Sequence, residues 1–122
     1  MIISGRTKLA GVMGWPVGHS RSPRLHGYWL DQYGIDGAYL PLAVSPDRFE
    51  QALRALPALG IRGVNLTVPH KEAALGIVDK IDPVARRIGA INTIFSAIVR
   101  FIFRASAESA RANVMRWRAP RF

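Results

Sequence analysis

The sequence predicts a three-layer α/β domain with a mainly parallel sheet flanked by helices. Two observations support this fold class: apolar, β-branched runs alternate along the chain with segments of helical periodicity, and proline or glycine separates them. The runs that predict strands are residues 8–13, 38–42, 61–66 and 91–95. Strands that alternate with helices are usually joined by right-handed crossovers and run parallel. Ligands bind outside the carboxyl ends of such strands, so we expect the loops after Met13, after Leu66 and around Asn92 to share one rim of the sheet.

The helices are predicted from capping residues and prolines. Their expected starts are Ser22-Pro23, Ser45-Pro46, Pro69 and Asp82-Pro83. Serine and aspartate cap helix N-termini, and proline suits the first helical position. Gly34 and Gly89 are placed to end the first and the last of these helices, because glycine readily adopts the left-handed conformation there. Pro41 has no backbone N–H to donate, so we expect the strand at residues 38–42 to lie at a sheet edge.

The composition narrows the class of protein. The chain has 122 residues, of which 49% are hydrophobic and 20% are charged, as expected for one globular domain. It has no cysteine, which excludes a disulfide framework and a zinc–thiolate site. No apolar run approaches membrane-spanning length and the N-terminal segment is too short for a signal peptide, so we expect a cytoplasmic protein without a membrane partner.

Positive charge is concentrated at the C-terminal end. The formal net charge is +9, and the last 27 residues hold six arginines and one glutamate. The regular alternation of elements stops after Phe95, so we expect a domain over residues 1–95 and a basic tail, rich in arginine and alanine, over residues 96–122. A helix from about residue 106 to residue 117 is expected by propensity. The tail could bind nucleic acid through phosphates, but no nucleic-acid-binding motif accompanies it, so we do not expect that partner.

Two serines precede the first predicted helix. Ser20 and Ser22 lie beside the N–H groups of a helix N-terminus, where a carboxylate could accept hydrogen bonds from both hydroxyls. The alternative is that Ser22 only caps the helix and Ser20 is only a loop residue. No third ligand at a useful spacing accompanies His19 and His26, so we expect no metal site.

A second polar segment, residues 65–71 (NLTVPHK), follows the third predicted strand. Asn65 and Thr67 are two residues apart and therefore face the same side. Lys71 lies one helical turn farther on, where the positive end of a helix dipole disfavours the charged form of an amine, as a general acid–base lysine requires. The alternative is an ordinary surface lysine after a turn.

Asn92 lies in a strand that is otherwise suited to burial. A buried asparagine needs hydrogen-bond partners, which ligand hydroxyls could supply. The alternative is a structural asparagine that bonds neighbouring backbone. No glycine-rich nucleotide-binding fingerprint occurs in the sequence.

Taken in order, these segments resemble the N-terminal, substrate-binding domain of shikimate dehydrogenase. The matching motifs are residues 14–23 (GWPVGHSRSP), 63–71 (GVNLTVPHK) and 89–93 (GAINT). The resemblance covers roughly residues 8–95, and three ordered motifs in one α/β frame are more specific than any one alone. The family reduces 3-dehydroshikimate to shikimate with NADPH, in aromatic amino-acid biosynthesis.

The resemblance implies a role for each candidate residue. The implied substrate-binding residues are Ser20, Ser22, Asn65, Thr67, Lys71 and Asn92. The two serines would hold the substrate carboxylate, Thr67 and Asn92 would bond ring hydroxyls, and Asn65 would shape the same rim. Lys71 would be the catalytic acid–base group, exchanging a proton with the substrate oxygen.

The sequence also departs from the family. Family members continue past the last motif with Asn-Thr-Asp, whose aspartate pairs with the lysine, and here no aspartate follows Asp82. The family's C-terminal Rossmann domain, which carries NADP, would need well over ~100 further residues. We therefore expect the substrate-binding part of a shikimate dehydrogenase, inactive alone and truncated or frameshifted after residue 95. The alternative is a non-catalytic shikimate- or quinate-binding fragment, or a half that needs a separate cofactor-domain chain.

Overall fold

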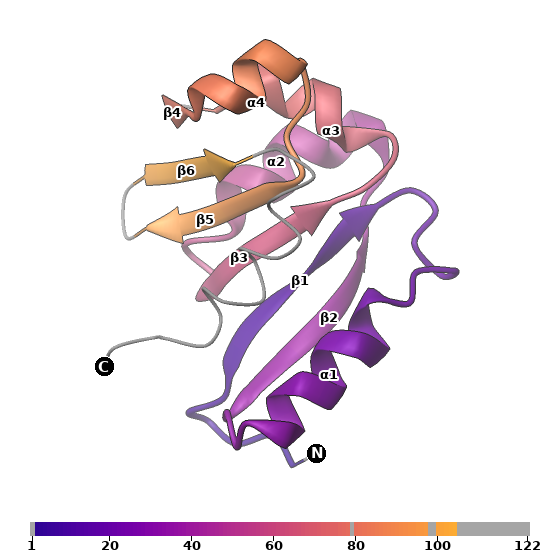
Figure 1. Cartoon of the computed structure of the whole chain (residues 1–122), viewed down its shortest axis with the longest axis vertical. Coiled ribbons are helices and arrows are strands. Elements are labelled where there is room, and N and C mark those ends of the chain that lie inside the picture. Colours follow the sequence, from indigo (N-terminus) through magenta and orange to yellow (C-terminus); the bar gives the residue numbers. More distant parts are fainter. Residues whose placement is uncertain (1, 79, 98–99, 105–122) are drawn as a thin grey trace.

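The computed structural model describes residues 2–78, 80–97 and 100–104. They form one six-stranded sheet in the order β2-β1-β3-β5-β6-β4 (Figure 1). The strands are β1 (Lys8–Gly14), β2 (Gly37–Ala43), β3 (Ile61–Leu66), β4 (Lys80–Ile81), β5 (Thr93–Ala97) and β6 (Arg100–Arg104). The predicted strands are thus confirmed as β1, β2, β3 and β5, and β2 lies at the sheet edge as Pro41 predicts. The two strands β4 and β6 were not predicted.

The sheet is mainly parallel, as expected. β1 runs parallel to both β2 and β3, and β4 runs parallel to β6. β5 is antiparallel to β3 and to β6, which differs from the expectation that the alternating strands run parallel. A parallel β5 would need a crossover that returns the chain to the end of the sheet where β3 begins. Instead the chain between β3 and β5 stays near the carboxyl end of β3, where the Ile91 amide donates to the Lys71 carbonyl at 2.8 Å.

Among the described residues, four α-helices and two short 3₁₀ turns accompany the sheet. They are α1 (Ser22–Gln32), η1 (Pro46–Arg48), α2 (Phe49–Ala55), α3 (His70–Ala73), η2 (Ala74–Gly76) and α4 (Pro83–Ile88). The predicted cap of α4 is confirmed, because the Asp82 carboxylate accepts from the Val84 amide at 2.8 Å. Gly89 ends this helix with a φ of 78°, and Gly34 follows α1 with a φ of 60°.

The predicted helix starts at Ser22-Pro23 and Ser45-Pro46 are confirmed, but neither serine caps its helix with its side chain. Ser22 is the first residue of α1 and Arg21 occupies the cap position, so the Ser22 side chain does not cap the helix. The Ser22 amide instead donates to the Ser20 hydroxyl at 3.3 Å, which satisfies one of the N–H groups that a helix start leaves without an intrahelical partner. Ser45 does precede a helical turn, but its side chain makes no capping hydrogen bond there.

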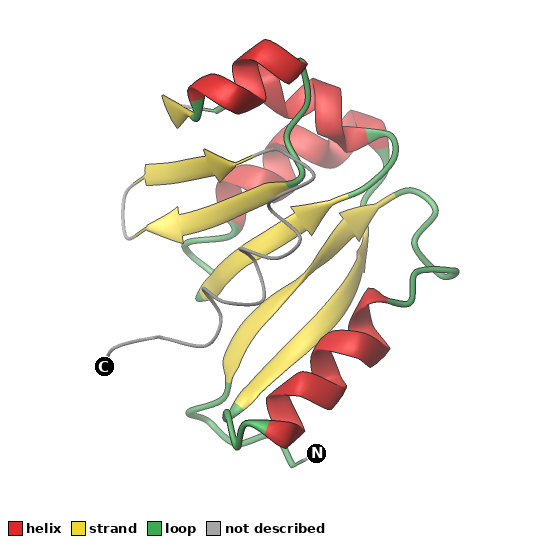
Figure 2. Ribbon diagram, in the orientation of Figure 1, coloured by secondary structure: helices red, strands yellow, loops and turns green. Residues whose placement is uncertain are grey.

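Alternation along β1 divides the core between the two faces of the sheet. Ala10 and Val12 pack in one cluster with Leu30 of α1, whereas Met13 packs in another with Phe49 of α2. Figure 2 shows α1 lying along β1 and β2, and α2, α3 and α4 gathered at the other end of the sheet. Burying a side chain such as Met13 or Phe49 stabilises the fold by about 1.5–3 kcal/mol. Because helices pack against both faces of the sheet, the three-layer prediction is confirmed.

The segment after Phe95 enters the sheet. β5 continues to Ala97, and β6 pairs with it as an antiparallel strand. The helix expected at residues 106–117 lies outside the described residues, and the division into residues 1–95 and 96–122 stays a prediction. Across the described part of the chain, no helix is both long and apolar enough to cross a membrane.

Candidate functional site

The carboxyl ends of β1 and β3 are joined to each other by backbone hydrogen bonds. The Thr67 amide donates to the Met13 carbonyl at 3.0 Å, and the Trp15 amide donates to the Val68 carbonyl at 3.1 Å. Gly14 lies between these bonds, and a Cβ atom there would collide with Cγ2 of Thr67. Only glycine at position 14 therefore lets the ends of β1 and β3 approach so closely.

Lys71 is positioned by a buried histidine beside it. The His70 ring is 1% exposed, stacks on Phe49 with ring centroids 4.1 Å apart, and lies with Nε2 2.7 Å from the Val44 carbonyl oxygen. Because a carbonyl only accepts, the His70 Nε2–H must donate in this bond. The Val44 amide in turn donates to the Gly14 carbonyl at 3.1 Å, so α3 is tied to the ends of β1 and β2.

The Lys71 side chain is half-buried at this rim. Its backbone carbonyl accepts from Ile91, which fixes Lys71 beside the segment that leads to Asn92. Within residues 2–78, 80–97 and 100–104, no acidic side chain forms an ion pair with the Lys71 amine.

Asn65 makes hydrogen bonds with both ends of its amide. Its Oδ1 accepts from the Tyr39 hydroxyl at 2.7 Å, and its Nδ2 donates to Thr93 Oγ1 at 3.1 Å and to the Asn92 carbonyl at 3.4 Å. The Thr93 hydroxyl donates to Asn92 Oδ1 at 3.3 Å. The Leu66 amide also donates to the Asn92 carbonyl, at 2.9 Å. These bonds place Asn92 beside Asn65 at the carboxyl end of β3.

The expectation that Asn92 shares this rim is thus confirmed, but for a different reason. The carboxyl ends of parallel strands were expected to meet there, whereas Asn92 precedes the antiparallel strand β5. The start of an antiparallel strand lies beside the end of its neighbour, and Thr93 pairs with Asn65 in this register.

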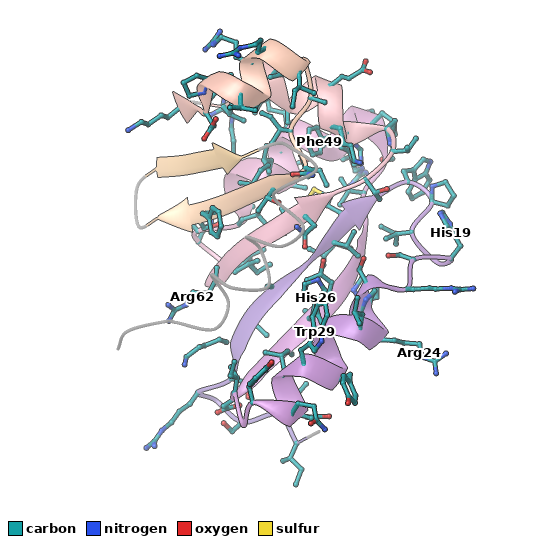
Figure 3. All side chains as sticks on the ribbon, viewed as in Figure 1. His19, Arg24, His26, Trp29, Phe49 and Arg62 are labelled. Carbon is teal, nitrogen blue, oxygen red and sulfur yellow. The ribbon has the colours of Figure 1, made fainter. Side chains whose placement is uncertain are left out.

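Ser20, in the loop before α1, and Ser22, the first residue of α1, are both half-buried. The Ser20 amide donates to the Val17 carbonyl at 3.0 Å, and its hydroxyl accepts from Ser22 as described above. Exposed cationic side chains of Arg21 and Arg24 flank the pair, and Figure 3 shows Arg24 and His19 at the outer edge of the molecule. No group of acidic and histidine side chains that could hold a metal ion occurs among the described residues.

Tyr39 is the site residue that sequence reasoning missed. It is only 6% exposed, and its hydroxyl crosses from β2 to Asn65 on β3, on the other side of β1. Burial raises the pKa of Tyr39, and this effect outweighs the lowering by the neighbouring Ser22 side chain. Tyr39 therefore stays protonated at neutral pH. A buried tyrosine needs a partner for its hydroxyl, and this need was the available signal.

His26 of α1 is stacked on Tyr39. The two rings are 4.0 Å apart and within 5° of parallel, and His26 meets the edge of Trp29 at 5.3 Å (Figure 3). Burial lowers the pKa of His26, so the ring is neutral at neutral pH. His26 thus packs against Tyr39 and Trp29.

Comparison with known proteins adds to this geometry. Residues 12–94 match the family model described as the shikimate dehydrogenase substrate binding domain. The chain is 66% identical over 92 residues to "Shikimate dehydrogenase (NADP(+))" of Paramagnetospirillum magneticum. The aligned region covers 75% of this chain and 33% of that protein. The chain is 67% identical over 93 residues to the protein of the same name from Rhodospirillum rubrum, covering 76% and 33% of the two chains.

A solved structure shows the same fold. The shikimate 5-dehydrogenase of Thermus thermophilus, solved in complex with shikimate, matches with a TM-score of 0.76 at 37% identity, covering 80% of this chain and 37% of that one. The chain thus spans about a third of the length of the curated relatives that it matches. The family model covers most of the chain and the solved structure shares its fold, so the chain belongs to the shikimate dehydrogenase substrate-binding domain family.

Proposed function

We propose that the rim formed by Ser20, Ser22, Asn65, Thr67, Lys71 and Asn92 binds shikimate or 3-dehydroshikimate, as the substrate-binding half of a shikimate dehydrogenase. The observation that carries the proposal is the backbone linkage of the rim. The Ile91–Lys71 and Leu66–Asn92 bonds hold the lysine and the asparagine against the end of β3, beside Asn65. A carboxylated ring that carries several hydroxyls matches this set of donors and acceptors.

Each end of the rim suits a different part of this ligand. The Ser20 and Ser22 hydroxyls would donate to the ring carboxylate, with Arg21 and Arg24 nearby to attract the anion. Thr67 would bond a ring hydroxyl, and so would Asn92. Asn65 already directs both amide protons to Thr93 and Asn92, so its role is to shape the rim.

Lys71 would serve as the general acid–base group of the reaction. Its amine would give a proton to the substrate oxygen when a carbonyl is reduced, and take one back when the alcohol is oxidised. The hydrogen bond from the Ile91 amide to the Lys71 carbonyl supports this role, because Ile91 directly precedes Asn92.

The described residues do not fit a dinucleotide. They contain neither the glycine-rich turn nor the phosphate-cradling helix start that holds one in a Rossmann unit. The groups that hold NADP must then come from outside residues 2–104, on this or another chain. Without them, the rim would bind shikimate or quinate without turning it over, which is the second candidate function.

A calorimetric titration of the chain tests the proposal. Shikimate should bind saturably, and Ser20→Ala should weaken it about tenfold while changing the affinity for the methyl ester of shikimate less than twofold, because the ester has no carboxylate. Lys71→Ala should weaken shikimate binding, whereas Lys80→Ala on β4 should not. Absence of saturable binding to the wild-type chain, or equal effects of Ser20→Ala on acid and ester, would contradict the proposal.

Turnover is assayed separately by following NADPH formation with shikimate and NADP. We expect none from these 122 residues alone. Measurable turnover that is lost in Lys71→Ala would show that groups in this chain do hold the nicotinamide, against our expectation.

A further inference from the structure

Tyr39 begins a hydrogen-bonded chain that leads through Asn65 to Asn92 at the rim. Its hydroxyl donates to Asn65 Oδ1 at 2.7 Å, Asn65 Nδ2 donates to Thr93 Oγ1 at 3.1 Å, and Thr93 donates to Asn92 Oδ1 at 3.3 Å. The chain thus runs from Tyr39 on β2, past the carboxyl end of β3, to Asn92 before β5.

The direction of every bond in this chain follows from one backbone carbonyl. The Asn92 carbonyl can only accept, so the atom of Asn65 that faces it must be Nδ2, which donates. Oδ1 of Asn65 then faces Tyr39, so the Tyr39 hydroxyl must donate. Since Thr93 Oγ1 accepts from Asn65, its own proton is directed to Asn92 Oδ1. Bonds aligned in one direction polarise and strengthen one another.

The ring of Tyr39 is held so that its hydroxyl reaches this position. The ring is buried in the same cluster as Ala10 and Val12 of β1 and Leu30 of α1. His26 stacks on it at 4.0 Å, and His26 belongs to α1, the helix that begins at Ser22. Packing of the ring and donation by the hydroxyl are therefore separable functions of one side chain.

We propose that Tyr39 is a positioning residue: its hydroxyl fixes the orientation of the Asn65 amide and, through Thr93, that of the Asn92 side chain. The effect on ligand binding rests on the proposed function, whereas the effect on Asn65 does not. Tyr39→Phe isolates the hydroxyl, because phenylalanine keeps the ring, its burial and the stack with His26.

The experiment compares Tyr39→Phe with Tyr28→Phe, a matched change at an exposed tyrosine of α1. In Tyr39→Phe we expect the affinity for shikimate to fall about tenfold, and the melting temperature to fall only by what the loss of one hydrogen bond costs, because the ring packing remains. Combining Tyr39→Phe with Asn65→Ala should weaken binding no further than Asn65→Ala alone, because Tyr39 acts through Asn65. Tyr28→Phe should change neither quantity.

A spectroscopic readout tests the orientation of the amide without ligand. The side-chain amide signals of Asn65 in a ¹⁵N-labelled chain are identified by their absence in Asn65→Ala. They should shift in Tyr39→Phe and stay in place in Tyr28→Phe. A purely structural role of Tyr39 would lower the melting temperature and would leave these signals where they are.

The outcomes separate the two proposals. A wild-type chain that does not bind shikimate overturns the proposed function, and the Asn65 signals alone then decide for or against Tyr39 as the residue that orients the amide. If the wild-type chain binds and Tyr39→Phe binds equally well, the positioning role is overturned and the proposed function stands. Weaker binding with unmoved Asn65 signals, or additive effects in the double variant, would also overturn the positioning role.

Discussion

Replacing Gly14 by alanine should push the two halves of the rim apart. A Cβ at this position would collide with Cγ2 of Thr67 and lie 3.4 Å from the Val68 carbonyl oxygen. Carbon atoms pack at about 3.5–4.0 Å, so the threonine side chain or the backbone must move by more than about 1 Å. Thr67 is β-branched and changes rotamer at a cost, and its amide is already committed to the Met13 carbonyl.

Overpacking of this kind costs about 1–3 kcal/mol of unfolding free energy. For a domain of this size, that loss lowers the melting temperature by roughly 3–6 °C per kcal/mol, measurable by circular dichroism or calorimetry. Shikimate affinity should fall as well, because Thr67 itself lies at the proposed site. Gly27→Ala in α1 is the matched control, since its Cβ meets nothing within 4 Å and alanine favours a helix.

A second variant checks the cause. Thr67→Ser removes Cγ2 and keeps the hydroxyl, so Gly14→Ala combined with Thr67→Ser should regain most of the stability and the affinity. Wild-type stability in Gly14→Ala, or no recovery in the double variant, would refute the claim that close approach to Thr67 requires glycine here.

Two further predictions concern the histidines. His70→Ala should destabilise the chain by about 2–4 kcal/mol in urea denaturation, because it removes a buried ring stacked on Phe49 and leaves the Val44 carbonyl without its donor. The control, His19→Ala at an exposed position, should change the unfolding free energy by less than about 0.5 kcal/mol. Equal effects of the two variants would argue against the role of His70. Burial lowers the pKa of His26 in the folded chain, so the unfolded chain binds the proton more readily, and stability should be full above about pH 6.5 and decline as the pH falls below that value. His26→Phe keeps an aromatic ring against Tyr39 and should reduce this decline in melts between about pH 7 and pH 5, whereas an unchanged decline would assign it to other groups.

Local chemistry in the sequence predicted the helix boundaries best. Asp82 caps α4 and Gly89 ends it, as predicted. Both effects depend only on residues within one helical turn, so a short stretch of sequence is enough to predict them. Ser22 shows the limit of the same rule. A serine before a proline can cap a helix, but here the Ser20 hydroxyl accepts from the Ser22 amide. Which of two neighbouring hydroxyls accepts depends on the conformation of the loop, which the sequence pattern does not predict.

The direction of β5 and the role of Tyr39 could not be predicted from the sequence. The elements between β3 and β5 are short, with four residues in α3 and six in α4, and the chain stays near the end of β3. The bond from Tyr39 to Asn65 crosses β1 and joins residues 26 positions apart, so it depends on the order of strands in the sheet. The candidate residues at the rim could be named from the sequence because they share short motifs, whereas the residue that links them could not.

A crystal structure of the chain with shikimate tests the central claim most directly. We predict that the ligand lies at the carboxyl ends of β1 and β3, with its carboxylate on the Ser20 and Ser22 hydroxyls, ring hydroxyls on Thr67 and Asn92, and one ring oxygen within hydrogen-bond distance of the Lys71 amine. A ligand bound elsewhere on the chain, or one at the rim with its carboxylate turned away from both serines, would contradict the account.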